Sequence, residues 1–571
     1  MTEYEFFLAS SLQKVFPSRR PVPMAEGSIL SLWRGTRGSV QLVYRRMDCQ
    51  GEMPHQCFNV EVVGAPFACQ MRKVRLIPSD YPCYGDYDAY YITTEPGLFP
   101  DLLESVDSGE ILPITRQYRS LWLTWEIPED AKPGDYEITV KVTAVKSKRI
   151  DNGLIYEDEN AAELAYALKF ILHVGAAELP AQTLIHTEWF YTDCLANYYG
   201  TEMFDERHWE IIENFIKAAH RHGVNMLLTP ALTPPLDTPK GSIRRIAQLV
   251  KIKKTKGQYS FDFSALVRWT DLCRKYGIEY LEIAHFFTQW GSEFTPNILA
   301  DVDGETRLIF GWDHPAAGED YREFMQAYIP QLRSVLEKQS YDAEHVYYHV
   351  SDEPSEAHLK AYQTARNVVR DLIPESQIMD ALSSVEFYKK GIVPHPIAGS
   401  SEIEDFYQAQ VPGLWVYYCC AQCKDVPNRF FAQESACTRM MGVLMYLYDI
   451  KGFLHWGFNF YNSKFSGHTI DPYVDSHSDF GFPSGDPFLV YPGKNGEALD
   501  SLRAEVQDEG LLDLRALHLL EKLAGRETVE EIIYRDIPQT RITFKSYPRD
   551  PQWLLNLRER VAAEIDRNIA L

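Results

Sequence analysis

The chain has 571 residues, 45% of them hydrophobic, so it is long enough to bury the cores of several domains. Its formal net charge of −23 argues against nucleic acid and anionic membranes as partners. No stretch approaches the roughly 18 apolar residues that a membrane-spanning helix needs. The first residues lack a basic region followed by a long apolar run, so we expect no signal peptide. The expected location is therefore cytoplasmic, with secretion as the alternative if a leader has been removed.

Residues 1–178 are predicted to form an all-β sandwich that serves as an accessory domain. Short runs that alternate or are wholly apolar predict strands, and Gly and Pro turn signals separate them. This punctuation is typical of a sandwich, and residues 133–140 resemble the last hairpin of an immunoglobulin-like domain. The predicted strands are residues 39–44, 58–63, 73–77, 120–125, 136–142 and 167–173.

Residues 179–526 have a different pattern, in which predicted strands alternate with predicted helices. Eight strands alternating with helices predict a (β/α)8 TIM barrel, which we assign as the catalytic domain. The predicted strands are residues 184–190, 224–229, 280–285, 345–353, 377–382, 396–400, 414–419 and 452–460. The predicted helices are residues 209–222, 263–276, 320–338, 355–373, 439–449 and 511–523.

A long segment, residues 461–495, follows the eighth strand and has no clear element of its own. It is rich in Gly, Pro, Asp, Ser and aromatic residues. Long loops in compact domains are usually functional, so we expect this one to lie over the barrel mouth. Residues 527–571 are predicted as a C-terminal extension that ends in a helix over residues 551–569.

Ten cysteines occur in a large chain without a secretion signal, so they are expected to stay reduced. Cys420 and Cys423 have C-x-x-C spacing, but a second pair at zinc-ligand spacing is missing. We therefore predict no metal site and no cofactor.

The fourth predicted strand ends in two adjacent carboxylates, Asp352 and Glu353, followed by Pro354. Pro354 cannot extend a strand ladder, and Ser355 suits the N-cap of the next helix. The two carboxylates therefore lie at the C-terminal end of a barrel strand, where such barrels place their chemistry. Asp352 and Glu353 are the predicted catalytic residues.

The other strand ends carry polar and aromatic side chains, which together with two carboxylates are typical of a sugar site. Successive strand residues face opposite ways, so only one of Tyr417 and Tyr418 should face the barrel mouth. For the acidic candidates, ion pairing within the barrel is the alternative reading. The predicted substrate-binding residues are Trp456, Asn459, Tyr417, Tyr418, His285, Glu188 and Asp380.

Glycoside hydrolysis usually needs two carboxylates on opposite sides of the scissile bond. The seventh predicted strand has no carboxylate before Asp425, so that arrangement is not evident here. Adjacent Asp352 and Glu353 instead fit a retaining mechanism assisted by a 2-acetamido group of the substrate. Asp352 would hold the acetamido N–H and stabilise an oxazolinium intermediate, and Glu353 would act as acid and then base.

Residues 180–525 resemble the catalytic domain of glycoside hydrolase family 123, and the N-terminal sandwich suits that family's architecture. The resemblance implies a β-N-acetylgalactosaminidase, with Asp352 as the acetamido stabiliser and Glu353 as the acid/base. It rests on residues 348–354 (YHVSDEP), 453–459 (FLHWGFN), 485–493 (GDPFLVYPG) and 501–503 (SLR).

Two other functions remain open from the residues. The first is a glycosidase for a sugar without an acetamido group, using Glu353 with a distant carboxylate such as Asp380 or Glu188. The second is a catalytically silent barrel that binds glycans. A glycan or glycoconjugate is the expected partner in each case.

Overall fold

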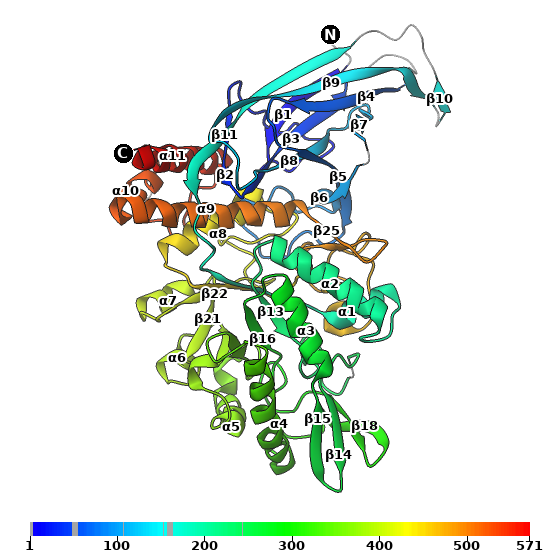
Figure 1. The fold of residues 1–571 in the computed structure, drawn as a ribbon, viewed down its shortest axis with the longest axis vertical. Helices are drawn as coiled ribbons and strands as arrows, with labels where there is room; N and C mark the ends of the chain where they lie inside the picture. The colour runs from blue at the N-terminus through cyan, green and yellow to red at the C-terminus, as the bar shows by residue number, and fades with distance from the viewer. Residues whose placement is uncertain are drawn as a thin grey trace.

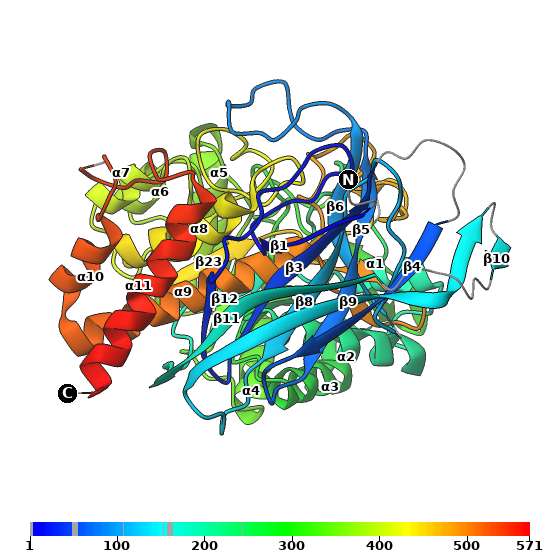
Figure 2. The ribbon, with the colours of Figure 1, turned by 90° about the horizontal axis from the view of Figure 1, so that it is seen from above.

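The computed structural model describes residues 4–47, 55–106, 108–151, 154–156, 164–242, 244–538 and 540–570. A β-sandwich from the N-terminal part lies against an eight-stranded barrel, and the last helix lies beside the sandwich (Figure 1, Figure 2). This architecture confirms the predicted fold class, a (β/α)8 barrel preceded by an all-β domain. None of the helices in these ranges has both the length and the apolar character that a membrane crossing requires.

Two sheets form the sandwich. The first has the order β1 (Tyr4–Ser10), β3 (Arg37–Arg46), β8 (Arg119–Glu126), β5 (Cys69–Ser79) and β6 (Gly97–Ser105). The second has the order β2 (Ile29–Arg34), β11 (Ala165–Glu178), β9 (Gly134–Asp151), β4 (His55–Val63) and β7 (Glu110–Ile111), with β10 (Leu154–Tyr156) paired to β9. All six predicted strands lie within these elements, whereas β1, β2, β6, β7 and β10 had no predicted counterpart.

Aromatic side chains from both sheets meet in the core of the sandwich. Phe6 on β1 packs edge-on against Phe58 on β4, with ring centroids 5.0 Å apart. Trp125 on β8 packs in the same way against Phe170 on β11 at 5.4 Å. Burial of these large rings supplies much of the driving force that holds the two sheets together.

Parallel ladders join the barrel strands in the order β19, β16, β13, β12, β23, β22, β21, β20, and one bridge between Tyr348 and Ile378 links the two ends of this order. Each of the eight predicted strands has a counterpart. The fourth ends at Tyr348 rather than running on to Glu353, because the chain turns out of the sheet before Pro354. The bounds are β12 (Ile185–Glu188), β13 (Met226–Thr229), β16 (Tyr280–Ile283), β19 (Val346–Tyr348), β20 (Met379–Leu382), β21 (His395–Gly399), β22 (Trp415–Tyr417) and β23 (Gly452–His455).

The helices around the barrel are α1 (Thr192–Tyr199), α2 (Glu206–Arg221), α3 (Ser264–Lys275), α4 (Glu319–Lys338), α5 (Leu359–Val369), α6 (Glu386–Lys389), α7 (Ile403–Gln408), α8 (Ser435–Leu447) and α9 (Leu502–Ala524). The predicted helix over residues 355–373 begins with a separate 3-10 turn (Glu356–His358) before α5. The closing helix α9 starts earlier than predicted, because Ser501 caps it and accepts a hydrogen bond from the backbone of Ala504 at 3.1 Å. Buried charged residues in its first turns hide the apolar periodicity there.

Smaller elements complete the chain. A four-stranded sheet without a predicted counterpart projects from the barrel at the bottom of Figure 1, and it contains β14 (Lys251–Thr255), β15 (Gln258–Asp262), β17 (Ile298–Val302) and β18 (Glu305–Phe310). A short pair of strands, β24 (Tyr491–Pro492) and β25 (Ala498–Leu499), precedes α9, and helix α10 (Arg526–Ile533) follows α9.

The last helix, α11 (Pro551–Ala570), corresponds to the helix predicted over residues 551–569. It packs against β2 and β11 of the sandwich (Figure 2). Asp566 on this helix bonds His173 on β11 at 2.9 Å and accepts the backbone N–H of Ala176 at 3.1 Å. These hydrogen bonds join the C-terminal helix to strand β11 of the sandwich.

Arg503 joins the sandwich, the closing helix and the long loop. Its guanidinium donates two hydrogen bonds to Asp101 on β6, at 2.8 and 2.9 Å, and others to the carbonyl oxygens of Gly485 and Phe488. Arg503 and Asp101 are each only 1% exposed. A charge buried this deeply is tolerated because it is fully paired.

Replacing Arg503 with Met should strongly destabilise the protein, because it leaves the carboxylate of Asp101 buried without its cation. We expect the free energy of unfolding to fall by about 3–5 kcal/mol. Urea unfolding followed by tryptophan fluorescence measures this loss. Arg75→Met is the matched control, since it removes an exposed pair with Glu104 and should change stability much less. Equal effects of the two substitutions would contradict the assignment.

Candidate active site

A cavity of about 210 Å³ lies at the C-terminal ends of the barrel strands. The strands or the residues just after them contribute Trp189, Ala381 and Leu454 to its lining. Tyr417 at the end of β22 also lines it, and loops contribute as well: Tyr84 comes from the sandwich and Phe482 from the long loop after β23. The long loop therefore borders the barrel mouth, as predicted.

Asp352 and Glu353 both line this cavity, and a different donor holds each of them. The side-chain amide of Gln289 donates to Asp352 Oδ2 at 2.9 Å, and the hydroxyl of Tyr417 donates to Glu353 Oε1 at 2.8 Å. Glu353 has a φ of 41°, a left-handed conformation that residues other than glycine rarely adopt. Because this turn ends the alternation of a strand, two neighbouring carboxylates reach one cavity.

Burial raises the pKa of both carboxyl groups, and the charge of Glu353 raises that of Asp352 further. Local groups oppose these shifts. The imidazolium of His349 and the amide of Gln289 favour ionised Asp352, whereas Tyr417 favours ionised Glu353. Since two adjacent buried carboxylates repel each other when both are charged, we expect the pair to lose its two protons in separate steps.

Two of the predicted substrate-binding residues, Tyr417 and Trp456, line the cavity. The indole of Trp456 donates to Asp486 Oδ2 at 2.9 Å, which fixes the orientation of the ring. Tyr418 points away from this lining and packs against His455, with ring centroids 5.2 Å apart. One tyrosine of the adjacent pair thus faces the mouth, as strand alternation requires.

Asn459 and Glu188 have structural partners and lie outside the cavity lining. The side chain of Asn459 bonds both the N–H and the C=O of Tyr191, at 2.9 and 3.1 Å. Burial disfavours the charge of Glu188, but Arg429 donates to it at 2.6 and 2.9 Å and holds its pKa well below the usual range. This matches the ion-pair alternative for Glu188 rather than a substrate-binding role.

His285 and Asp380 also lie outside the lining, in a buried cluster around His349. The two ring nitrogens of His349 bond Asp380 at 2.9 Å and Glu282 at 2.5 Å. Burial disfavours the charged form of His349, yet these carboxylates raise its pKa to about 10. His349 is therefore a buried cation whose charge acts on Asp352.

The side chains of His285, His349 and Asp380 offer ligand atoms within 4.8 Å of one another, close enough for a metal ion. The ring geometry does not fit one. The imidazoles of His285 and His349 stack with centroids 4.2 Å apart and planes 18° apart. Lone pairs in two nearly parallel stacked rings do not converge on a single ion, and both nitrogens of His349 already bond carboxylates.

Three lining residues with charged or amide side chains were not among the predicted site residues: Asp237, Gln289 and Lys464. Gln289 follows the third barrel strand closely, so a search a few residues beyond each strand end would have found it. Lys464 belongs to the long loop already expected over the mouth. Asp237 lies in a Pro-rich loop after β13 and gave no signal of its own.

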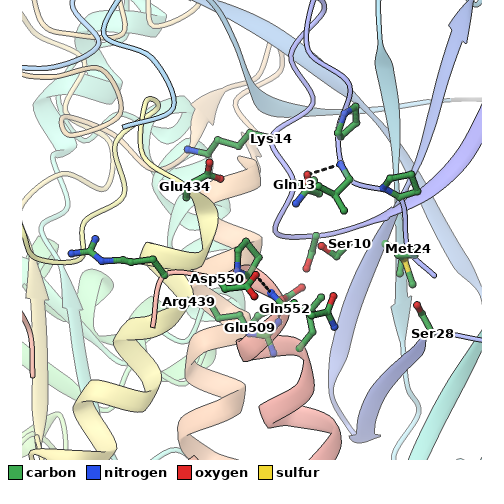
Figure 3. Close-up of a pocket in the computed structure, with 18 of the residues that line it drawn as sticks. Ser10, Gln13, Lys14, Met24, Ser28, Glu434, Arg439, Glu509, Asp550 and Gln552 are labelled. Carbon is green, nitrogen blue, oxygen red and sulfur yellow. Dashed lines mark hydrogen bonds and ion pairs between the residues drawn. The ribbon is translucent and has the colours of Figure 1, made fainter. Parts of the chain in front are cut away.

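A larger cavity of about 740 Å³ lies between the sandwich and the start of α11 (Figure 3). Lys14 and Glu434 lie side by side in it, and Lys14 also donates to the carbonyl oxygens of Phe430 and Phe431. Glu509 in the same lining accepts a hydrogen bond from Arg439 at 3.0 Å. These charges are engaged with neighbouring groups and lie away from the barrel strand ends, so we place the chemistry in the smaller cavity.

Comparison with known proteins agrees with this geometry. A family model described as glycoside hydrolase 123, catalytic domain, matches residues 189–520. Among solved structures, the chain is similar to a family 123 glycoside hydrolase from Clostridium perfringens whose study concerns glycolipid glycan hydrolysis. The two share 16% identity and a TM-score of 0.71, with 100% of this chain and 98% of that chain covered.

A second solved structure is the xylanase 10B of Clostridium thermocellum, with its CBM22-1 and GH10 modules. It has 11% identity over 90% of this chain and 94% of that chain, and its TM-score of 0.32 is too low to support an inference. No curated protein matches the chain.

Replacing Tyr417 with Phe should raise the pKa of Glu353. The hydroxyl of Tyr417 donates to the ionised carboxylate, so its removal destabilises the charged form. A ¹³C NMR titration of labelled glutamate side chains measures the shift. Tyr418→Phe is the control, since it removes a hydroxyl outside the cavity. An unchanged or lowered pKa in the Tyr417 variant would contradict this assignment.

Proposed function

Because this chain belongs to glycoside hydrolase family 123, we propose that it removes terminal β-linked N-acetylhexosamine, in particular N-acetylgalactosamine, from glycans. The proposed reaction retains the anomeric configuration and uses the substrate's own acetamido group as the nucleophile. The family match makes the chain a glycosidase, while the sugar and the mechanism are our proposal.

The observation that carries this proposal is the arrangement of Asp352 and Glu353. They are adjacent in sequence, share one cavity and are bonded by different donors, Gln289 from the loop after β16 and Tyr417 at the end of β22. Glu188 and Asp380, the distant carboxylates of the alternative mechanism, are bound to Arg429 and His349 instead. An adjacent pair suits assistance, because one carboxylate can steer the acetamido group while the other moves protons.

Substrate binding decides where the shared proton resides. The acetamido N–H donates to Asp352, as the amide of Gln289 already does, and this favours the ionised form of Asp352. The proton is then held by Glu353, whose buried carboxyl has a raised pKa, as a general acid needs. Binding of the correct sugar thus prepares the acid for the reaction.

The bond changes follow from these positions. The acetamido oxygen attacks the anomeric carbon as the glycosidic bond breaks, and Glu353 gives its proton to the leaving oxygen. Asp352 stabilises the positive charge of the resulting oxazolinium ion. Glu353, now ionised, takes a proton from water, which attacks the same carbon and restores the acetamido group. The hydroxyl of Tyr417 keeps Glu353 in place throughout.

One observation supports a second mechanism. Asp237 is a third carboxylate in the described lining of the cavity. It could serve as a direct nucleophile opposite Glu353 in an enzyme for sugars without an acetamido group. Such an enzyme would accept a plain β-galactoside and would bind a thiazoline mimic of the oxazolinium ion no better than an ordinary sugar.

We expect the protein to hydrolyse aryl β-N-acetylhexosaminides but not the aryl β-galactoside. Glu353→Gln should lower kcat/KM by roughly 10²–10⁴-fold for substrates with a poor leaving group, because the general acid is lost. Asp352→Asn should lower it for every acetamido substrate, and a thiazoline mimic should inhibit the wild type strongly. Release of the aryl group, followed by absorbance, measures each rate.

Glu344→Gln is a matched control, since Glu344 is exposed just before the same barrel strand. It should leave all rates unchanged. Hydrolysis of the plain galactoside with no thiazoline inhibition would contradict assistance by the acetamido group and favour Asp237 as nucleophile.

A further inference from the structure

Two charged side chains in the catalytic cavity have no part in the proposed proton transfers. Asp237 comes from the loop after β13, and Lys464 comes from the long loop after β23. One is an acceptor when ionised, and the other is a donor only. Charged groups of this kind at a glycosidase site are suited to bind sugar hydroxyls.

Asp237 is linked to the catalytic pair through one side chain. The backbone N–H of Asp237 donates to Gln289 Oε1, and Nε2 of the same Gln289 donates to Asp352 Oδ2. Asp237 also has a φ of 43°, in the left-handed region that a non-glycine residue adopts only when its surroundings hold it there. Its position relative to Asp352 is therefore fixed before substrate arrives.

The carboxylate of Asp237 lacks a partner for one of its oxygens. Oδ2 is closed off from solvent and makes no hydrogen bond within the described structure. Burial raises the pKa of Asp237 to about 6, although Arg244 and the backbone N–H groups of Phe465 and Ser466 oppose the rise. A buried acceptor without a donor is costly, and rotation of the carboxylate toward the cavity that Asp237 lines would let a substrate hydroxyl supply the missing donor.

Lys464 offers a hydrogen-bond donor from the long loop after β23. It is exposed, and in the described part of the chain its ammonium group lies near the rings of Phe465 and Phe482, at 5.4 and 5.8 Å. Its backbone N–H bonds the carbonyl oxygen of Ser478 at 3.0 Å, which anchors the residue within the long loop. The ammonium group is thus available to a ligand.

We propose that Asp237 and Lys464 bind hydroxyl groups of the terminal sugar and determine which C4 epimer the enzyme accepts. This rests on the proposed function, in which the acetamido group on C2 meets Asp352. C3 and C4 follow C2 around the ring, so the side chain joined to Asp352 through Gln289 is placed to accept from their hydroxyls. The orientation of the C4 hydroxyl is the difference between the gluco and galacto sugars.

The test compares aryl β-N-acetylgalactosaminide with aryl β-N-acetylglucosaminide, which differ only at C4, in Asp237→Asn and Lys464→Met variants. For the preferred epimer, kcat/KM should fall by roughly 10- to 100-fold, the usual value of a hydrogen bond to a charged group. The fall should be smaller for the other epimer, so their ratio should move toward unity. KM should rise more than kcat falls.

Matched controls separate binding from support of the loop. Asp475→Asn removes the charge of a carboxylate that accepts the backbone N–H groups of His477 and Asp479 in the same long loop. Lys424→Met removes an exposed lysine paired with Asp86. Both should leave the epimer ratio unchanged, and all variants should keep the melting temperature of the wild type within a few degrees.

An unchanged epimer ratio in a folded Asp237→Asn protein overturns the proposal. Equal loss of turnover for both epimers, restored by azide, also overturns it and identifies Asp237 as the nucleophile. If the wild type hydrolyses neither substrate, the proposed function fails, and calorimetric binding of N-acetylgalactosamine and N-acetylglucosamine still decides the inference. Selective binding that Asp237→Asn abolishes supports the proposal, whereas equal binding of the two sugars by the wild type overturns it.

Discussion

The buried ion pair between Arg503 and Asp101 is the contact on which the barrel mouth depends. The two side chains are 1% exposed, so leaving either charge buried without its partner would strongly destabilise the folded protein. Arg503 also bonds the carbonyl oxygens of Gly485 and Phe488, and Tyr491 donates to Asp101 at 2.5 Å. One charge pair thus fixes the sandwich, the closing helix and the long loop together. The fixed loop in turn supplies Asp486, which orients Trp456 in the cavity.

The acidic residues of the barrel show how surroundings assign different roles to the same chemical group. Glu188 is fully buried but remains ionised, because Arg429 lies against it. Asp352 and Glu353 have no arginine or lysine ion pair in the described structure, and their pKa values rise. The contrast separates a carboxylate held by an ion pair from two carboxylates with perturbed pKa values, which are typical of functional sites. Sequence position alone would not distinguish these acids, since all of them lie at or near strand ends.

Much of the fold could be predicted from sequence because the barrel strands are short apolar runs between clear helix signals. Parallel strands buried on both faces have that pattern. Even the strand predicted over residues 396–400, which includes a proline and a glycine, has its counterpart in β21. The position of Asp352 and Glu353 at the barrel mouth was also predicted, although the strand before them ends at Tyr348, several residues ahead of Pro354. The family resemblance of residues 180–525 agrees with the matched range of 189–520.

The lining of the cavity was harder to predict, because strand ends show which residues are near the mouth but not which way they point. The side chain of Asn459 makes its hydrogen bonds to the backbone of Tyr191, because buried polar groups need partners. Asp237 and Lys464 lie in loops whose shape depends on contacts distant in sequence, so no local pattern placed them together. The C-terminal helix gave a strong signal for its own existence but none for its packing on the sandwich.

The sandwich does more than flank the barrel, since Tyr84 from one of its loops lines the catalytic cavity and donates to the carbonyl oxygen of Gly481 at 3.2 Å. Ser79 on β5 bonds Ser484 in the long loop at 2.6 Å. A fragment trimmed to the family-matched region would therefore lose part of the wall around its own substrate. The wall of this cavity is therefore built by both domains, and a change in the sandwich loop that carries Tyr84 would alter its shape.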